Sequence, residues 1–418
     1  MKLRNCIKLA VVAACCAPAF AFATNGYFQH GYGVKSQGMA GVGIALPQDA
    51  LAAATNPAGM AFVGDRVDLG ATWFRPMRGA DLSGANPFLP AGAYEGNQTN
   101  DFIIPEFGYN KMINPSLALG VSVYGNGGMN TDYNRPIPLF NGGATNTSGV
   151  DFTQLFISPT ISYKITPEHA LGLAVNFAHQ SFAAKGLQGF AGFSSNPAAL
   201  TDVGHDSANG WGARVGWTGR ITDAVTLGAT YQSKTKMGKF NKYAGLFEDQ
   251  ASFDVPANFG AGIAVKAAPT FMLAFDVQRI QYSGIPAVGD PSVARLLAGR
   301  LLGSSGGPGF GWQDMTVYKL GASWDYSPTL TFRAGVSHGK QPIQAQDTLF
   351  NILAPGVIED HATLGLTWAV SKTGELSFSY MHGFNKNVSG AVPAALGGGN
   401  VNLRMYQNSL GIAYGWKL

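Results

Sequence analysis

Residues 409–418, at the C-terminus, alternate between large apolar side chains and small or polar ones. The apolar series is Leu410, Ile412, Tyr414, Trp416 and Leu418, and the other series is Ser409, Gly411, Ala413, Gly415 and Lys417. A period of two places the two series on opposite faces of a β-strand. One apolar face and one small or polar face are typical of a transmembrane β-barrel strand, which contacts lipid on one side and the lumen on the other.

Segments with a similar pattern follow one another along the chain after Asp65. We predict fourteen strands, near residues 66–77, 101–113, 116–126, 151–164, 168–182, 209–221, 224–237, 251–266, 269–282, 312–326, 329–340, 359–370, 374–384 and 402–418. Single-chain bacterial barrels contain an even number of strands, so this count fits a barrel.

The links between these segments alternate between two lengths. Tight links with turn-forming residues include Asn114-Pro115, Thr166-Pro167 and Ser327-Pro328. Long links lie between them, near 78–100, 127–150, 183–208, 238–250, 283–311, 341–358 and 387–401. An outer-membrane barrel has short periplasmic turns and long external loops. We therefore predict an all-β fold, a 14-stranded antiparallel transmembrane β-barrel.

Composition is consistent with this fold but does not select it. Charged residues make up 12% of the chain, which is about half of the usual quarter. After the first 23 residues, no apolar run reaches the length of about 18 residues that a transmembrane helix needs. A large secreted β-sandwich or solenoid would have a similar composition, and the alternating link lengths are the strongest argument for the barrel.

The first 23 residues have the pattern of a secretory signal peptide. Lys2, Arg4 and Lys8 form a basic region, Leu9 to Phe20 form an apolar core, and Ala21-Phe22-Ala23 matches a cleavage site. We therefore expect cleavage near Ala23, export, and insertion into a Gram-negative outer membrane.

All three cysteines, Cys6, Cys15 and Cys16, lie in this leader, so the mature chain would have no thiol chemistry. Processing as a lipoprotein at Cys15 is an alternative, although it would leave a short apolar core. Removal of three basic residues takes the formal net charge from +4 to +1. No cluster of basic residues indicates a nucleic-acid partner.

The stretch from Thr24 to Met60 is rich in Gly and Ala and precedes the first strand. We interpret it as an N-terminal plug, or hatch, inside the lumen. The predicted domains are a signal peptide at 1–23, the plug at 24–64 and the transmembrane β-barrel at 65–418.

Several short motifs resemble the FadL/TodX (OmpP1) family of outer-membrane transporters. They are Gly38-x-x-Gly41-x-Gly43-x-Ala45, Asp49-Ala50, Asn56-Pro57-Ala58-Gly59-Met60, Gly307-Pro308-Gly309-Phe310-Gly311-Trp312 and Gln407-Asn408-Ser409-Leu410-Gly411. The resemblance covers essentially the whole mature chain. It implies a passive channel for long-chain fatty acids or hydrocarbons that needs no cofactor. It also implies a monomer that the barrel-assembly machinery inserts among outer-membrane lipids, although the terminal Leu418 departs from the usual aromatic residue.

The resemblance further implies a lateral exit where the third strand is kinked near the Asn-Pro-Ala segment. We therefore assign Asn56, Pro57 and Ala58 to a gate together with Gly125, Gly127 and Gly128, and expect the two groups to face each other. Glycines within a strand mark bulges or breaks in pairing. Two alternatives stay open, namely that these glycines only begin the next loop and that Asn56-Pro57 is a plain turn.

Three groups of residues are candidates for substrate binding. Alternation directs Arg214, Lys319 and Arg333 inward, where they would either pair with Asp276, Asp325 or Asp49, the alternative we favour, or bind a fatty-acid carboxylate. Tyr27 and Phe28 would cap an apolar pocket. The long loops carry apolar residues that would pack on each other or form a landing site for substrate, namely Phe190, Phe193, Leu246 and Phe247.

The sequence gives no positive indication of catalysis. Gly335-Val336-Ser337-His338-Gly339 matches the G-x-S-x-G motif, but it lies in a strand pattern rather than at a strand-to-helix elbow. The seven histidines show no metal-ligand spacing. We therefore predict a passive channel for hydrophobic molecules and not an enzyme. The alternatives are a lipid-acting outer-membrane barrel enzyme and a general porin or adhesin.

Overall fold

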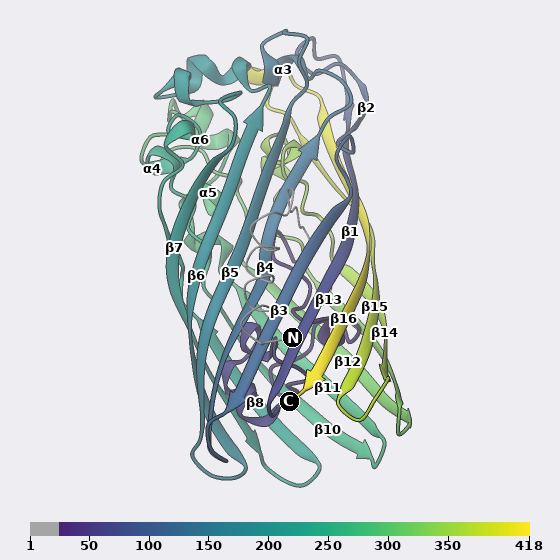
Figure 1. Ribbon diagram of the computed structural model, residues 1–418. Coiled ribbons are helices and arrows are strands. Elements are labelled where there is room, and N and C mark those ends of the chain that lie inside the picture. Colours follow the sequence, from purple (N-terminus) through teal and green to yellow (C-terminus); the bar gives the residue numbers. More distant parts are fainter. Residues whose placement is uncertain (1–24) are drawn as a thin grey trace.

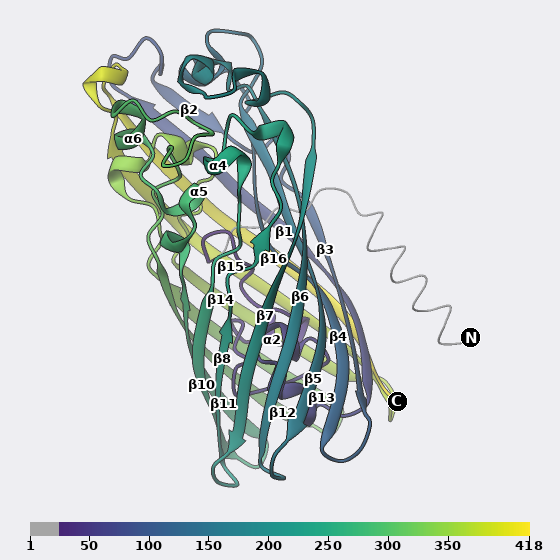
Figure 2. The same ribbon diagram turned by 90° about the vertical axis from the view of Figure 1, so that its left-hand side faces the viewer.

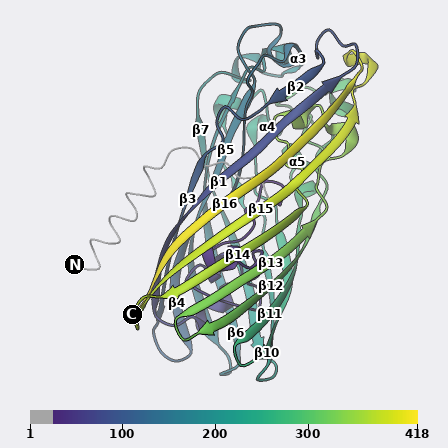
Figure 3. The ribbon, with the colours of Figure 1, turned by 90° about the vertical axis from the view of Figure 1, so that its right-hand side faces the viewer.

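Fourteen antiparallel strands form a closed barrel wall in the computed structural model, which describes residues 25–418 (Figure 1). The wall strands are β1 (Arg66–Ser83), β3 (Phe102–Met112), β4 (Leu117–Asp132), β5 (Gly149–Lys164), β6 (His169–Lys185), β7 (Asp206–Arg220), β8 (Val225–Gln232), β10 (Asn258–Ala268), β11 (Phe271–Ile280), β12 (Met315–Ser327), β13 (Leu330–Gly339), β14 (Asp360–Ala369), β15 (Gly374–Ala391) and β16 (Asn400–Lys417). Two short strands, β2 (Gly92–Glu95) and β9 (Lys236–Met237), pair with β1 and β7. Pairing of β16 with both β15 and β1 closes the wall (Figure 3).

The predicted fold class and the number of wall strands are confirmed. Five predicted strands are wrong at one boundary each. The strands predicted at 66–77, 116–126 and 374–384 continue to Ser83, Asp132 and Ala391, whereas β8 ends at Gln232 and β10 begins at Asn258. Pro256 has no N–H to donate to a ladder, and the residues just before it leave the wall, so that Phe253 and Val255 are fully buried. The predicted signal peptide, its cleavage site and the three cysteines lie outside the described residues.

The helical elements are short. They are α2 (Val34–Gln37), α3 (Pro138–Asn141), α4 (Glu248–Ala251), α5 (Pro286–Gly289) and α6 (Val293–Leu297), with 3-10 turns η1 (Ala52–Ala54), η2 (Pro57–Phe62), η3 (Gln188–Phe193), η4 (Pro197–Ala199), η5 (Asn241–Tyr243), η6 (Tyr282–Gly284), η7 (Ala345–Asp347), η8 (Phe350–Ile352) and η9 (Ala394–Leu396). Within residues 25–418, no helix has the length and apolar character to cross a membrane. Helices α3 to α6 gather at one end of the barrel, which we call the long-loop end (Figures 1 and 2).

The two faces of each strand differ as the sequence pattern predicts. On β16, Leu410 is 50% exposed, whereas its neighbour Ser409 is 6% exposed. The exposed positions of the wall are mainly aliphatic and aromatic, which suits contact with lipid. The inner positions carry small and polar side chains, so the lumen is available for another part of the chain.

Residues 25–64 occupy that lumen, and nearly all of them are buried (Figure 2). This inner segment lies so close to the wall at some positions that only glycine fits on the wall strand. A Cβ on Gly216 would lie 1.9 Å from Asn56 Oδ1, and a Cβ on Gly172 would lie 2.2 Å from the backbone nitrogen of Ala58. A wall of fourteen strands is wider than the eight-stranded barrels that side chains alone can fill, so this segment supplies much of the interior.

Candidate functional site

Two neighbouring wall strands, β3 and β4, stop pairing partway along their length. The ladder between β3 and β4 runs from Met112↔Ala118 to Glu106↔Tyr124 and ends there. Residues 102–105 of β3 still pair with β1, and β4 continues through residues 125–132 paired with β5. We call the unpaired stretch, residues 102–105 facing 125–129, the wall gap. The glycines therefore lie within a continuing strand and do not begin the next loop.

Both edges of the wall gap have a chemical reason to be unpaired. Pro105 lacks an N–H and weakens the ladder on the β3 side. On the β4 side, a β-bulge lies between Gly125 and Gly127, so Asn126 is an extra residue opposite β5. A bulge bends its strand and disrupts local pairing. The glycines were a signal in the sequence, whereas Pro105 was missed although it lies within an alternating strand pattern.

The N-terminal residues take the place that β3 leaves free along β4. Phe28 forms a β-bridge with Gly127. The backbone N–H of Gln29 donates to the carbonyl of Asn126 at 3.0 Å, and Gly128 N–H donates to the carbonyl of Tyr27 at 3.0 Å. The Tyr32 hydroxyl donates to Asn126 Oδ1 at 3.0 Å. Tyr27–Gln29 thus close the inner side of the wall gap with backbone hydrogen bonds.

The predicted position of Asn56-Pro57-Ala58 opposite Gly125, Gly127 and Gly128 is wrong. Asn56 Nδ2 donates to the carbonyl of Trp217 at 2.9 Å, and Ser162 Oγ donates to the carbonyl of Ala58 at 2.9 Å. These partners lie on β7 and β5, away from the gap edge. The reason is space, since wall glycines on β6 and β7 admit this corner while Tyr27–Gln29 already occupy the edge of β4.

The Asn56 side chain forms hydrogen bonds to backbone groups, as expected for an asparagine at a corner of the chain. Its Oδ1 accepts from Ala58 N–H at 3.1 Å, and its Nδ2 also donates to the carbonyl of Ile44 at 2.7 Å and to Thr218 Oγ1 at 3.0 Å. Pro57 follows at the first position of η2, where a missing N–H costs nothing. Asn56 is therefore an N-cap that also joins the inner segment to β7.

Replacement of Asn56 by Ala is expected to lower the free energy of unfolding of the barrel by about 1–3 kcal/mol, because a cap and buried hydrogen bonds are lost together. Heat-dependent gel mobility of the purified protein measures this change. Asn241→Ala, at an exposed loop position, is the matched control and should leave the transition unchanged. An Asn56→Ala protein as stable as the parent would show that this corner does not anchor the segment.

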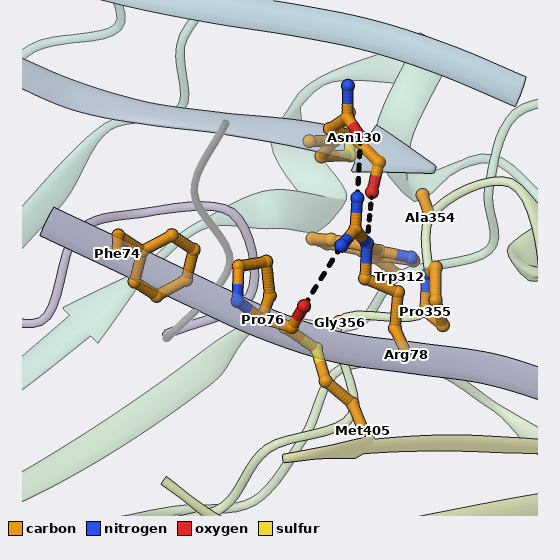
Figure 4. A pocket seen from close by; sticks show the side chains of 10 residues that line it. Phe74, Pro76, Arg78, Asn130, Trp312, Ala354, Pro355, Gly356 and Met405 are labelled. Carbon is orange, nitrogen blue, oxygen red and sulfur yellow. Dashed lines mark hydrogen bonds between the residues drawn. The ribbon is translucent and has the colours of Figure 1, made fainter. Parts of the chain in front are cut away.

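Arg78 extends from β1 to Asn130 on β4, which follows the wall gap along that strand (Figure 4). Its guanidinium donates to the carbonyls of Pro76 at 3.0 Å, Asn130 at 2.7 Å and Thr99 at 2.7 Å, and to Asn130 Oδ1 at 2.5 Å. It is 1% exposed and forms no ion pair with any residue in the described range. Arg78 therefore ties β1 to the upper part of β4. Strand alternation alone did not single it out.

A small cavity lies beside this guanidinium. Its volume is about 20 Å³, and its lining includes Phe74, Met129, Trp312, Pro355 and Met405. That volume is enough for about one water molecule and not for a hydrocarbon. The structure therefore shows the interior next to the wall gap in a filled, closed arrangement.

An aromatic cluster lies between the wall gap and the long-loop end. The Tyr27 ring centroid is 5.4 Å from that of Phe28, 5.2 Å from Tyr282 and 5.9 Å from Trp312. Trp312 Nε1 donates to Asn351 Oδ1 at 2.6 Å. The cluster confirms that Tyr27 and Phe28 lie in apolar surroundings, although their role toward a substrate stays a prediction.

The four loop residues singled out in the sequence divide into two kinds. Phe190 and Phe247 are buried, and Leu246 packs against them half-buried, whereas Phe193 is 44% exposed. Phe190, Leu246 and Phe247 line a second cavity, of about 40 Å³, with Leu302 and Phe310. Packing of the loop tips on each other is therefore observed, and one aromatic ring remains accessible.

The three candidate cations point inward but do not form the predicted ion pairs. Arg214 donates to the carbonyl of Thr55 at 2.9 Å and also contacts Gln232. Lys319 donates to the carbonyls of His30 at 3.2 Å and Gly41 at 3.4 Å.

Arg333 likewise donates to Gln48 Oε1 at 3.0 Å and to Thr367 Oγ1 at 2.7 Å. The expected pairing of these cations with Asp276, Asp325 or Asp49 is wrong. Polar acceptors of the inner segment, largely backbone carbonyls, take the place of the carboxylates.

Wall carboxylates complement these cations by accepting from backbone N–H groups of residues 25–64. Glu106 accepts from Gly33 at 3.2 Å and Val34 at 3.0 Å. Asp276 accepts from Gly43 at 2.8 Å and Ile44 at 3.0 Å.

The inner segment has little regular secondary structure to pair its own backbone groups, and buried unpaired groups are costly. Charged wall residues therefore hold it by its main chain.

One carboxyl group in the outer loops is expected to make loop stability depend on pH. Burial first, and then the neighbouring Asp290 carboxyl, raise the pKa of Glu248 from 4.5 to about 7. The folded loops thus bind a proton more tightly than the unfolded chain, so their stability is greatest below pH 4.5 and falls as the pH rises through about 7.

Hydrogen exchange of residues 240–255, corrected for intrinsic rates, should be slower at pH 5 than at pH 8. The Glu248→Gln variant should lose this difference. An equal pH dependence in parent and variant would assign the effect to another group.

Ser337 of the G-x-S-x-G match lies within β13 and has no elbow. Its hydroxyl is 2.9 Å from His30 Nε2 and 3.3 Å from His361 Nδ1, with no carboxylate bonded to either ring within residues 25–418. In the same part of the chain, no group of three or more His, Cys, Asp or Glu side chains is placed to hold a metal ion.

Comparisons with known proteins agree with this architecture. A family profile described as "Outer membrane protein transport protein (OMPP1/FadL/TodX)" matches residues 10–415. The solved structure of the Pseudomonas putida toluene transporter TodX is 19% identical, with 93% of this chain and 99% of that chain covered and a TM-score of 0.69. A Pseudomonas aeruginosa FadL homologue is 16% identical, with 94% and 99% covered and a TM-score of 0.69.

The Ralstonia pickettii toluene transporter TbuX is 17% identical, with 93% and 98% covered and a TM-score of 0.64. Among curated protein sequences, none matches this chain.

Proposed function

Because this chain belongs to the OMPP1/FadL/TodX family of outer-membrane transport proteins, we propose that it is a passive channel for hydrophobic small molecules. In this proposal a molecule lands among the apolar loop tips, passes into the aromatic cluster and leaves sideways through the wall gap into the membrane. No cofactor and no covalent step is required, since burial of apolar surface drives each transfer.

The wall gap is the observation that carries this proposal. A barrel normally leaves no unpaired edge, yet residues 125–129 of β4 have no partner on the β3 side, where Tyr27–Gln29 cover them from inside. Tyr27–Gln29 are a short stretch outside the ladders of the wall, and such a stretch is released more easily than a wall strand that is paired on both sides. The wall gap therefore offers a lateral route that opens without breaking the barrel.

The inner segment acts as a plug in this proposal. The chain is proposed to consist of a signal peptide (1–23), a plug (24–64) and a barrel (65–418), inserted by the barrel-assembly machinery as a monomer. Arg214, Lys319 and Arg333 hold the plug, because their hydrogen bonds go to it and to neighbouring wall groups. Tyr27 and Phe28 then supply apolar contact rather than charge to the molecule in transit.

The class of substrate follows from the same contacts. The candidate cations donate to neutral acceptors. Arg78 likewise donates to four neutral oxygen atoms of its own. A carboxylate would have to displace these acceptors, whereas an uncharged molecule would not. We therefore favour neutral hydrocarbons, such as the toluene named for TodX and TbuX, over long-chain fatty acids.

Uptake by a deletion strain tests the proposal. The strain, with and without the restored gene, is grown on a panel of aromatic hydrocarbons, alkanes and long-chain fatty acids, and initial uptake of labelled compound is measured. Restoration should increase uptake of the hydrocarbons most. Equal uptake of every compound by both strains would contradict a transport role, and a gain confined to fatty acids would contradict the substrate class.

A further inference from the structure

Trp211 marks the upper edge of the apolar outer surface on β7. It is 61% exposed and contacts Phe177 at a ring distance of 4.8 Å. On the side of Trp211 away from the long-loop end the outward positions are apolar, including Val215. Toward the long-loop end the outward positions are Asn209 and Ser207. Exposed aromatic residues line the two membrane interfaces of such barrels. Trp211 therefore lies where the outer-leaflet headgroups begin.

Lysines lie at this level. Lys236 is the cross-strand partner of Trp211, so the two side chains share the outer face, and Lys236 is 80% exposed. Lys234, two residues earlier, is exposed on the same side of the chain, while the intervening Thr235 is buried. Lys239 is also exposed. We call Lys234, Lys236 and Lys239 the rim lysines.

The rim lysines are poorly neutralised. The sequence from Lys234 to Lys242 contains four lysines and no acidic residue. Lys236 Nζ is 3.5 Å from the buried Asp254. Within the described range, the ammonium groups of Lys234 and Lys239 have no hydrogen bond or ion pair.

Elsewhere at the long-loop end most basic groups are matched. Lys185 pairs with Asp132 at 2.7 Å, and Arg404 pairs with Asp81 at 3.2 Å. Lys386 likewise contacts Glu359. The rim lysines differ from these paired groups, because four lysines follow one another on the β8–β9 side within nine residues.

We propose that the rim lysines bind the phosphates of a phosphorylated glycolipid in the outer leaflet. Ammonium groups are strongly hydrated point charges suited to phosphate, and basic clusters at a membrane surface attract anionic lipid headgroups. Tyr231 and Phe259 are paired across β8 and β10 and both are exposed. Together with Trp211 they give the acyl chains an aromatic surface directly below the charges. A free phosphate ion would use the lysines but not these rings.

Titration of the purified mature protein with diphosphorylated lipid A, in nonionic detergent at low ionic strength, tests the proposal. The combined variant Lys234→Gln, Lys236→Gln and Lys239→Gln should bind roughly 100-fold more weakly than the parent, given the usual contribution of each basic residue near a membrane surface. The combined Lys266→Gln, Lys372→Gln and Lys417→Gln variant removes three lysines that are exposed in the structure and lie outside the rim. It should bind like the parent.

Replacement of the rim lysines by arginine should retain binding, which separates loss of charge from loss of fold. Unchanged affinity in the rim Gln variant, or an equal loss in the control variant, would overturn the proposal. Equally tight binding of dephosphorylated lipid A would overturn the role of phosphate. Full displacement of lipid A by excess inorganic phosphate would show that the ligand is the free ion and not the lipid.

Discussion

Deletion of Asn126 is expected to abolish most transport while the barrel still folds. Asn126 is the extra residue of the bulge, since Gly125 pairs with Leu155 and Gly127 pairs with Gln154. Without it β4 can run straight past residues 102–105 of β3, which are already extended and paired with β1. Closure of the wall gap should lower initial uptake of a labelled hydrocarbon at least about tenfold, because the bulge is what bends the strand away from its neighbour.

Two controls separate closure of the gap from general damage. Asn126→Ala removes the side-chain contacts with Tyr32 and Gln154 but keeps the bulge, so it should retain most of the uptake. Deletion of Gly143, where an added Cβ would meet open space, shortens an outer loop by one residue and should also retain uptake. Normal uptake by a folded Asn126-deleted protein would mean that substrates leave the barrel by another route.

The fold was predictable because its constraints repeat along the chain. Every wall strand must show one face to lipid and one to the lumen, so the same period of two recurs, as in Ser409 to Leu418. Boundaries failed at the long-loop end, where β1, β4 and β15 continue beyond their predicted ends and where β8 and β10 are shorter than predicted. Residues 251–257 continue the apolar pattern, but Phe253 and Val255 turn inward to join the aromatic cluster. A buried aromatic interior and a lipid surface select the same residue types.

The site was less predictable because it depends on contacts between distant segments. Gly125 and Gly127 showed in the sequence that β4 is irregular, but nothing local indicates that Phe28 pairs there. Asn56-Pro57 was recognisable as a corner, whereas its partner strand depends on wall glycines more than a hundred residues away, such as Gly172. The alternation of side-chain direction along the strand placed Arg214 inward but did not indicate that a backbone carbonyl would be its acceptor.

Simultaneous replacement of Glu106 and Asp276 by Ala is expected to release the plug and make the channel leak. Each carboxylate accepts two buried backbone N–H groups of residues 33–44. Loss of both leaves four donors unpaired, at a cost of about 1–3 kcal/mol for each buried group. The wall does not depend on these contacts, because its own ladders are intact. The variant should therefore keep its barrel and admit polar solutes that the parent excludes.

Entry of a large hydrophilic antibiotic into cells measures this leak, and trypsin cleavage after Lys35 in the purified protein reports release of the segment directly. Cleavage and antibiotic entry should rise together, by at least about tenfold if half of the estimated binding free energy is lost. The double variant Glu168→Ala, Asp325→Ala removes one half-buried and one exposed carboxylate outside the plug contacts and should match the parent. A tight channel with a protected Lys35 in the Glu106, Asp276 variant would show that the plug is held by packing and not by its main-chain hydrogen bonds to charged wall residues.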